Sequence, residues 1–572
     1  MKALQETCRK VLPTAPNPPH YRRQRGFALM IMMLIMVLGT SWALVNAING
    51  ASSNTVSAQK QTGDALTLAK YALLGYVAQQ ATTSDVPGMF PCPESTSSIG
   101  TTNEGTENSS CSTLPAIGRL PWKTLGIDKP LDGSGEALWY VVGSGVRAAP
   151  INFSTTGSLT VDGTSNAAVA VIIAPGSALN TASSTSTAPS PCVKRDQTPG
   201  RGSTPLNSSD FVECGNATLS AFTSSRNDSW GNDRLVSITA TEMLKAIEGA
   251  VADRIQRKVA PALNGTAAST GWYQNDSTNE WGAKFFPYAS TWSNPTTDDS
   301  CGNNGVTEGL LPLASGNVTS GTGCSARWTS ATATKLSGSG SFSGVSCTAN
   351  TTRMRCQFTY SGRPVVRMTT TASNIAMGFR TSPTTSDITF TPTSGNSISS
   401  LTPSIVASTG AGQVVLTVTM ANKSSSGTGR INIPHPSDSY LINTSTGSNP
   451  DIAWFINNNW NYYTYYSISP AVTANPSGTC TSANVTNCLT LTNAEAGTGN
   501  VNDKRIVLIL SGRPLAGKTL PSATLGDYFE AQNASTGDRT FQRDTISTTF
   551  NDRPSVCPFQ RQTTGTAEIL CN

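Results

Sequence analysis

The chain has 572 residues, of which only 13% are charged, so Ser, Thr, Asn and Gly supply most of its polar positions. Its formal charge of +5 belongs entirely to residues 1–26, because the rest of the chain has 33 basic and 33 acidic residues. This balance leaves no overall excess of basic residues for binding nucleic acid. The length allows about four domains.

A basic leader, residues 1–26, comes directly before a long uncharged stretch. Three arginines precede the Gly26–Phe27 junction, and no Asp, Glu, Lys or Arg follows it until Lys60. Residues 27–45 are mostly apolar and approach the ~20 residues that cross a hydrocarbon core. Because basic residues favour the cytoplasmic side, the sequence predicts one transmembrane helix with the bulk of the chain outside. The residues expected in the bilayer include Phe27, Leu29, Ile31, Leu34, Leu38 and Leu44.

The leader, the junction and the apolar run together resemble the N-terminal signal of type IV pilins and of type II secretion pseudopilins. The resemblance implies that a prepilin peptidase cuts after Gly26 and that Phe27 is then methylated. It also implies a bacterial inner-membrane protein with one spanning helix and a periplasmic bulk, which reaches the cell surface or a pilus after assembly. The implied partners are other pilins or pseudopilins, the peptidase and inner-membrane lipid, without nucleic acid.

One position departs from the pilin pattern. Pilins usually carry Glu at the fifth mature position, which is Ile31 in this chain. A missing carboxylate at this position is typical of minor members at the filament tip, so the resemblance implies a tip or initiating subunit. An ordinary signal peptide cut near residues 45–47 remains the alternative, because small residues there suit the secretory peptidase.

The helix is expected to continue beyond the membrane. Apolar residues from Leu66 to Val77 recur at the spacing of one helix face. The predicted transmembrane and spine helix therefore covers 27–82. A pilin-like α+β head with antiparallel sheet, which contains the first copy of an internal repeat, is expected over 83–320.

Two distant stretches carry the same features in the same order, which indicates one structural unit used twice. Each has an aromatic strand, an apolar strand flanked by glycine, an acidic segment and an Asn-Asp-Arg triplet. The triplets are interpreted as polar turns whose Asp or Asn caps local backbone groups, with a paired functional site as the alternative. The blocks are 138–140, 171–179, 210–216 and 232–234 in the first copy, and 464–466, 507–515, 527–533 and 551–553 in the second.

A helix and a β-rich module are predicted between the two copies. Thr239 and Glu242 form a capping-box pattern that opens an amphipathic helix at about 240–259. Over 321–450, short alternating strands separated by Gly, Ser and Asn turns predict an inserted all-β, sandwich-like module. Residues 451–572 are assigned to the second repeat copy and a disulfide-closed C-terminus.

Twelve cysteines follow the leader, an even number in a segment expected to lie in an oxidising compartment. Successive neighbours predict six local disulfides, while spacing alone leaves the connectivity open. Metal ligation is not expected, because the chain has no Cys-x-x-Cys and only two histidines. The pairs are Cys92 with Cys111, Cys192 with Cys214, Cys301 with Cys324, Cys347 with Cys356, Cys480 with Cys488, and Cys557 with Cys571.

Few residues suggest catalysis or ligand binding. His435 is the only histidine after the leader and no G-x-S-x-G elbow accompanies it, so a His-dependent hydrolase is not expected. An aromatic patch is divided between Tyr465 and Tyr466, which are expected in the core, and Trp454 and Trp460, which are candidate binding aromatics. Two acidic groups offer oxygen ligands for calcium, the one cofactor considered. These are Asp298 with Asp299, and Asp128 with Asp132 and Glu136.

The sequence therefore predicts an α+β protein with three parts: a long N-terminal transmembrane spine helix, a pilin-like head with antiparallel sheets, and an inserted all-β module. The expected function is that of a non-enzymatic minor pilin or pseudopilin-like subunit at the tip or initiation complex of a filament. A surface adhesin or carbohydrate-binding protein that uses a pilin-like anchor is the alternative.

Overall fold

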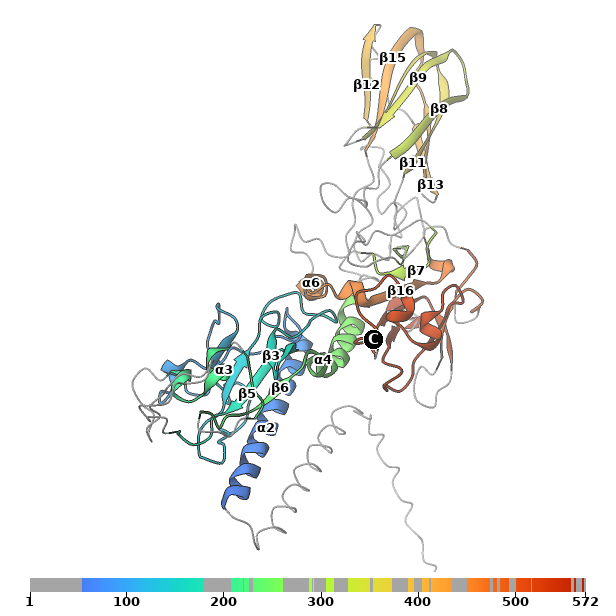
Figure 1. Ribbon diagram of the computed structural model, residues 1–572. Coiled ribbons are helices and arrows are strands. Elements are labelled where there is room, and N and C mark those ends of the chain that lie inside the picture. Colours follow the sequence, from blue (N-terminus) through green and yellow to red (C-terminus); the bar gives the residue numbers. More distant parts are fainter. Residues whose placement is uncertain are drawn as a thin grey trace, which may run out of the picture.

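A computed structural model describes residues 54–179, 207–260, 286–312, 328–372, 389–434 and 450–556, with short gaps inside some of these ranges, together with 560–561 and 568–569. The chain forms two similar helix-and-sheet units and a separate β-module (Figure 1). The two units share one hydrophobic core, and the module has its own.

The first unit is helix α2 (Asn54–Thr83) packed on a four-stranded antiparallel sheet. The buried face of α2 presents Ala65, Ala69, Leu73 and Val77, which recur every three or four residues and therefore form one stripe. The sheet has the order β1-β2-β5-β6. Its strands are β1 (Ala116–Arg119), β2 (Trp139–Val142), β5 (Ala170–Ala174) and β6 (Arg234–Ile238).

The second unit repeats this arrangement with helix α4 (Ala240–Arg254) and its π-helical extension η3 (Ile255–Val259). Thr239 caps α4, and its side chain and that of Glu242 exchange hydrogen bonds with the opposite backbone N–H groups, so the predicted capping box is confirmed. The second sheet has the order β7-β16-β19-β21. Its strands are β7 (Glu308–Leu310), β16 (Thr464–Ile468), β19 (Ile506–Leu510) and β21 (Arg553–Val556).

The two sheets match residue by residue. Tyr140 pairs with Gly118 and Ile172 in the first sheet, as Tyr466 pairs with Gly309 and Leu508 in the second. The match extends to the segments after the helices. Phe90 and Phe286 are both fully buried, and their N–H groups donate to the carbonyls of Val146 and Val472, which follow β2 and β16 by the same number of residues. The repeating unit therefore begins with its helix, and α4 has the place in the second unit that α2 has in the first.

Smaller elements complete each unit. In the first, a hairpin of β3 (Leu159–Val161) and β4 (Thr164–Ala168) bridges in parallel to Phe222. In the second, β17 (Leu489–Thr492) pairs with β18 (Val501–Lys504) and in parallel with β20 (Thr540–Gln542). Helical turns join these pieces, namely η1 (Thr96–Ser98), η2 (Ser208–Asp210), α3 (Cys214–Thr218), α6 (Pro450–Asn457), η4 (Trp460–Tyr463), η5 (Pro470–Val472), η6 (Leu525–Asp527) and η7 (Ala531–Ala534). The strands β22 (Gln560–Arg561) and β23 (Glu568–Ile569) pair with each other.

The β-module lies between β7 and β16 of the second unit, at the position where only a short connection joins β1 to β2 in the first. It stands at one end of the molecule, away from α2 (Figure 1). Its two four-stranded sheets have the orders β12-β15-β10-β9 and β13-β14-β11-β8. The strands are β8 (Trp328–Gly338), β9 (Phe342–Ala349), β10 (Arg353–Gly362), β11 (Pro364–Ala372), β12 (Thr389–Gly395), β13 (Ser404–Gly410), β14 (Gln413–Thr419) and β15 (Lys423–Pro434).

The predicted fold class is wrong, because the described chain is mostly β-sheet in several sheets and its helices are few. The polar positions of α2, which include Lys60, Asp64 and Lys70, reduce its hydropathy. Across the described ranges, no helix is both long enough and apolar enough to span a bilayer. This finding contradicts the predicted single-pass location in the inner membrane. The anchor residues from Phe27 to Leu44 and the junction at Gly26 lie outside the described residues.

The predicted division of the chain also differs from the observed one. From the sequence, residues 83–320 are expected to form the pilin-like head with the first copy, and residues 451–572 the second copy with the C-terminus. The structure places α4 and β7 with the second unit, so the module interrupts that unit after β7. The difference arises because the shared sequence blocks begin at β2 and β16, whereas the helix and first strand of each unit have diverged in sequence.

Candidate functional site

Each unit buries a pair of acidic residues at the Asn-Asp-Arg triplet. In the first unit, Asp233 lies just before β6 and is 1% exposed, and Glu213 lies just before α3 and is 4% exposed. In the second, Asp552 is 1% exposed and Glu530 is 8% exposed. Buried carboxyl groups are uncommon and need partners, so these pairs are the first candidates for a functional site.

The same hydrogen bonds hold both pairs. Oδ2 of Asp233 accepts from the backbone N–H of Glu213 at 2.8 Å and from Nδ2 of Asn216 at 3.1 Å. In the second unit, Oδ2 of Asp552 accepts from the N–H of Glu530 at 2.9 Å and from Nδ2 of Asn533 at 2.9 Å. Each Asp therefore joins its strand to a turn about twenty residues earlier in the chain.

The surrounding backbone is also repeated. Cys214 and Ala531, which directly follow the two glutamates, adopt φ values of 50° and 49°. A left-handed conformation is uncommon for residues other than glycine, so its recurrence at equivalent positions indicates one conserved local geometry. Asn232 and Asn551 likewise donate to the carbonyls of Ser177 and Arg513, just beyond β5 and β19.

Burial raises the pKa of Asp233 well above its usual value, and the neighbouring Glu213 carboxyl raises it further. Burial, and then the charge of Glu530, raise the pKa of Asp552 in the same way. The Oδ1 atom of each Asp is buried and receives no hydrogen bond within the described chain. The raised pKa of each Asp favours its protonated form, in which Oδ1 would be able to donate to the facing glutamate.

These pairs do not have the geometry of a glycoside hydrolase. Such enzymes separate their two carboxyl groups by about 5 to 9 Å to make room for a sugar or a water. Here Oδ2 of Asp233 is occupied by donors of the chain, and both Glu213 and Asp233 are buried. The triplets are therefore buried connectors between a turn and a strand, rather than the local turn caps expected from the sequence.

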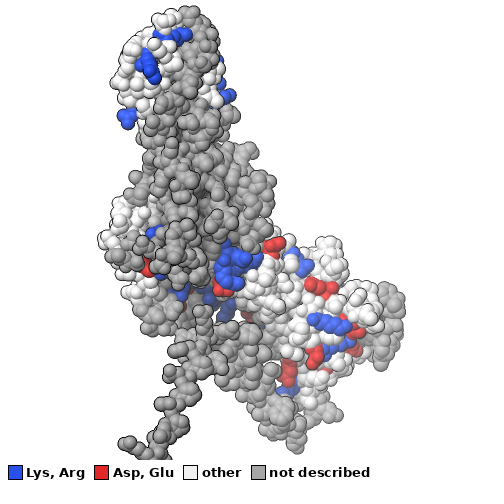
Figure 2. Space-filling model, turned by 180° about the vertical axis from the view of Figure 1, so that it is seen from behind, with Lys and Arg blue, Asp and Glu red and all other residues white. Residues whose placement is uncertain are grey.

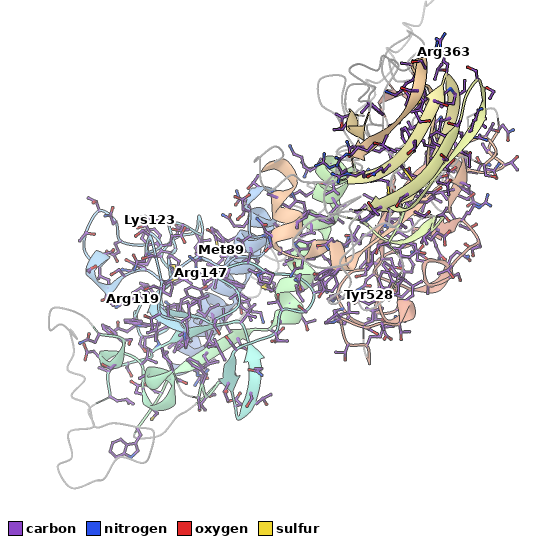
Figure 3. All side chains as sticks on the ribbon, turned by 90° about the horizontal axis from the view of Figure 1, so that it is seen from above. Met89, Arg119, Lys123, Arg147, Arg363 and Tyr528 are labelled. Carbon is purple, nitrogen blue, oxygen red and sulfur yellow. A yellow bond between two sulfur atoms is a disulfide. The ribbon has the colours of Figure 1, made fainter. Side chains whose placement is uncertain are left out.

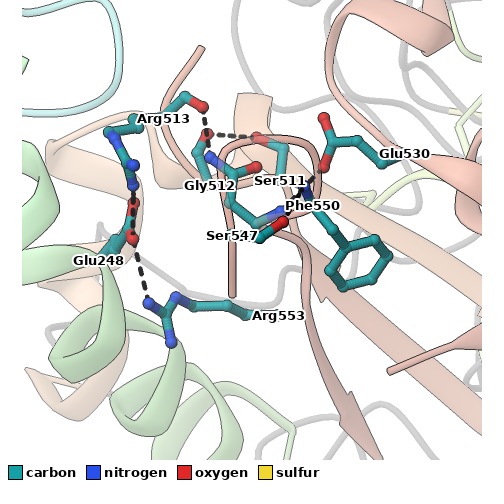
Figure 4. A network of polar contacts seen from close by, with 9 residues as sticks. Glu248, Ser511, Gly512, Arg513, Glu530, Ser547, Phe550 and Arg553 are labelled. Atoms are coloured by element: carbon teal, nitrogen blue, oxygen red, sulfur yellow. Dashed lines mark hydrogen bonds and ion pairs between the residues drawn. The ribbon is translucent and has the colours of Figure 1, made fainter. Parts of the chain in front are cut away.

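A third buried acid joins α4 to the sheet of the second unit. Glu248 of α4 is 1% exposed and accepts hydrogen bonds from Nη1 of Arg513 at 2.8 and 3.0 Å (Figure 4). It also accepts from Nη2 of Arg553 at 3.0 Å. Arg553 is the arginine of the second triplet and begins β21, whereas Arg513 follows β19, so the two charged pairs tie α4 to two strands of the second sheet. Their short distances are the favourable geometry that burial requires.

Asp132, one of the candidate calcium ligands, already accepts hydrogen bonds from the chain on both carboxylate oxygens. Asp132 is fully buried, and its Oδ1 accepts from the N–H groups of Ser134 and Glu136 while its Oδ2 accepts from that of Gly176. Within the described ranges no group of three His, Cys, Asp or Glu residues could hold a metal ion. Asp298 and Asp299 lie outside the described residues, as does His435.

The two candidate binding tryptophans belong to the core. Trp454 and Trp460 are 0% exposed, and Arg254 lies 4.1 Å from the ring centre of Trp454. Trp460 packs edge-on against Phe153 of the first unit at 5.0 Å between ring centres. Neither ring presents a face to a ligand. Large aromatics bury more apolar area than other side chains, and this accounts for their use between the units.

Three of the predicted disulfides are present. They join Cys92 to Cys111, Cys347 to Cys356 and Cys480 to Cys488, with Cα–Cα distances of 5.8, 4.0 and 4.9 Å. Cys214 is also disulfide-bonded. The other predicted cysteines, Cys192, Cys301, Cys324, Cys557 and Cys571, lie outside the described residues.

Glu94 is a buried acid to which no sequence motif points. It is 2% exposed, burial raises its pKa, and it lines a small pocket with Arg119, Trp122 and Lys129. Figure 3 places Arg119 and Lys123 on the first unit, far from Arg363 of the module. The paired acids, unlike Glu94, can be identified from the sequence, because Glu, Asn and Asp recur in the same order in both copies.

Comparisons of the chain with models of protein families, with curated proteins and with solved structures each found no match.

Proposed function

We propose that the protein is a non-enzymatic subunit of the pilin or pseudopilin class, with a place at the tip or initiation complex of a filament. The observation that carries the proposal is helix α2. It begins shortly after the apolar run at 27–45, packs one face on an antiparallel sheet and leaves the opposite face uncovered.

The uncovered face of α2 has the features of a contact surface. Val56, Leu68 and Tyr71 are 52%, 45% and 66% exposed. Gly63 and Gly75 lie on the same side, and a Cβ atom on either would meet nothing within 4 Å. Exposed apolar side chains beside accessible backbone allow a second helix to approach closely. In the proposal, the occupant of this face is the corresponding helix of another pilin-class subunit.

A structural role also agrees with the chemistry of the buried acids. The oxygens of Asp233, Asp552 and Asp132 that receive hydrogen bonds receive them from backbone or amide N–H groups of the chain itself. Such groups hold the fold and are not free to bind a substrate. The proposed partners are therefore other pilins or pseudopilins, and a prepilin peptidase that acts at Gly26 and Phe27.

The alternative of carbohydrate binding through Trp454 and Trp460 has no support in the geometry, because both rings are buried. Surface recognition by the β-module is a separate possibility that does not depend on aromatic rings.

Photo-crosslinking tests the proposed contact. A photoreactive amino acid at Tyr71 is expected to capture a second pilin-class protein in cells that assemble the filament, and mass spectrometry identifies the adduct. The same group at Thr332, an exposed position of the module, serves as the matched control. The proposal fails if Tyr71 yields no adduct with a protein carrying a prepilin-type signal, or if both positions capture it equally.

A further inference from the structure

The balanced charge of the chain after residue 26 conceals two parts of opposite sign. Residues 321–450 have nine Lys or Arg and only two acidic residues, Asp387 and Asp438, a net charge of +7. The rest of the chain after residue 26 therefore has 24 basic and 31 acidic residues, a net charge of −7. The overall charge balance argues against a nucleic-acid ligand for the whole chain, but the module by itself has the excess of basic residues that such a ligand attracts.

The structure places part of this charge on one outer face of the module. Arg353 and Arg355 alternate with the buried Met354 and Cys356 along β10, so both arginines point away from the module core. Arg430 lies opposite Gln357 on the adjacent strand β15. Arg355 donates from Nε to Oδ1 of Asn432 at 3.1 Å, which holds its guanidinium along the sheet surface.

Further cations extend around the module. Arg367 is exposed on β11 of the second sheet, and Lys335 and Arg363 are exposed near the turns that join β8 to β9 and β10 to β11. Among the described residues of the module no Asp or Glu occurs. Figure 2 shows Lys and Arg but no acidic side chain on the described surface of this end of the molecule.

These features select the class of ligand. Seven of the nine cations are arginines, whose planar guanidinium matches the geometry of phosphate. Phe358 and Tyr360 are buried, and Phe342 and Phe390 pack against that core, so these rings are not available to stack sugars or unpaired bases. A surface with dispersed arginines, on which none of the aromatic side chains that the structure describes is exposed, suits a stiff polyanion that is held through its backbone. Duplex DNA has the highest regular density of phosphate, with one charge per about 1.7 Å of its axis.

We propose that the β-module binds the phosphate backbone of double-stranded DNA without reading its sequence. Binding by backbone contacts alone positions a protein on the duplex and carries no base information. The acidic body of the molecule would be repelled by the same polyanion, so the two parts orient the module toward the DNA. This inference goes beyond the proposed assembly role and does not depend on it.

The test measures binding of the full chain to a fluorescent 30-base-pair duplex by anisotropy over a range of salt concentrations. The test variant carries Arg353→Gln, Arg355→Gln and Arg430→Gln, the three arginines on one outer face of the module. The control variant carries Lys60→Gln, Lys245→Gln and Arg257→Gln, which remove the same charge from exposed positions of α2, α4 and η3. The leader is identical in all three proteins and so contributes equally to each.

The test variant is expected to bind at least ~10-fold more weakly at 100 mM salt, and the slope of log K against log salt should fall by about 2 to 3, because each phosphate contact contributes about 0.9. The control variant should stay within about twofold of the parent chain. The proposal is overturned if the parent chain does not bind at 50 mM salt, or if both variants weaken equally. It is also overturned if polygalacturonate, at equal charge concentration, displaces the duplex completely, since the module would then select acidic polysaccharide.

Discussion

Asp233 and Asp552 occupy equivalent positions in the two units, and each accepts a hydrogen bond from the backbone N–H of a buried glutamate and from the amide of an asparagine. The sequence around the two sites has diverged, yet both acids, both amides and the left-handed residue after each glutamate adopt the same arrangement. The protein is therefore built from two copies of one unit that share a core.

The Asp552 carboxylate is expected to be needed as an acceptor rather than as a charge. Asp552→Ala leaves the N–H of Glu530 and the amide of Asn533 without a buried acceptor, which should reduce the free energy of unfolding by about 2 to 4 kcal/mol. Asp552→Asn retains an acceptor oxygen and should cost less than about 1 kcal/mol. Thermal and urea unfolding measure both. Asp544→Ala, at an exposed site nearby, is the control, and equal losses for the Ala and Asn variants would refute the assignment.

The raised pKa values of Asp233 and Asp552 predict a pH dependence of stability. The folded chain holds more protons than the unfolded chain between the ordinary carboxyl pKa of about 4 and the raised values. The contribution of these groups is therefore full below about pH 4 and is lost as the pH rises toward the raised values. The double variant Asp233→Asn and Asp552→Asn should gain melting temperature relative to the parent as the pH increases from 5 to 9. A constant difference in melting temperature between the variant and the parent over that range would contradict the raised pKa values of Asp233 and Asp552.

Glu248 is predicted to hold α4 on the sheet of the second unit. Glu248→Ala leaves the guanidinium groups of Arg513 and Arg553 without their shared partner, and loss of one member of a buried ionic cluster costs about 3 to 5 kcal/mol. Asp253→Ala is the matched control, because that residue pairs with Arg257 on the same helix but both side chains are more than half exposed. Exposed pairs contribute about 0 to 1 kcal/mol. Similar effects of the two substitutions on thermal unfolding would show that the cluster is not needed.

Gly118 and Gly309 are predicted to be intolerant of a side chain. A Cβ atom at Gly118 would collide with the carbonyl oxygen of Glu94, and one at Gly309 with that of Ser290, at equivalent bridges of the two units. Gly118→Ala and Gly309→Ala should therefore each lower the melting temperature. Gly63→Ala should raise it slightly, because alanine favours a helix over glycine by about 0.5 to 1 kcal/mol and the site has open space. Neutral effects at Gly118 and Gly309 would contradict the close backbone approach.

Local signals in the sequence were sufficient for several elements. The capping box at Thr239 and Glu242 identified the start of α4, and the spacing of Leu66, Ala69, Leu73 and Val77 identified the buried face of α2. Three neighbouring cysteine pairs formed as expected. These features depend on residues close together in the chain, where helix geometry and short loops restrict the outcome.

Features that depend on tertiary packing could not be predicted from local sequence patterns. The aromatic character of Trp454 and Trp460 did not reveal that both rings are buried, Trp454 beside Arg254 and Trp460 beside Phe153 of the first unit. That α4 belongs to the second unit follows from the equivalent backbone hydrogen bonds of Phe90 and Phe286. These bonds cannot be recognised in the sequence. The partnership of Asp233 with Glu213 could have been inferred from the recurrence of both residues in the second copy. Glu94 carried no such signal.

The most direct test of the proposed filament role is mass spectrometry of the N-terminus of the chain purified from cells that make a prepilin peptidase. The proposal predicts a mature chain that begins at Phe27 with a methyl group on its amino nitrogen, and an uncut chain when Gly26 is changed to a bulkier residue. A mature chain that begins at Ile48, as an ordinary signal peptide would leave, contradicts it.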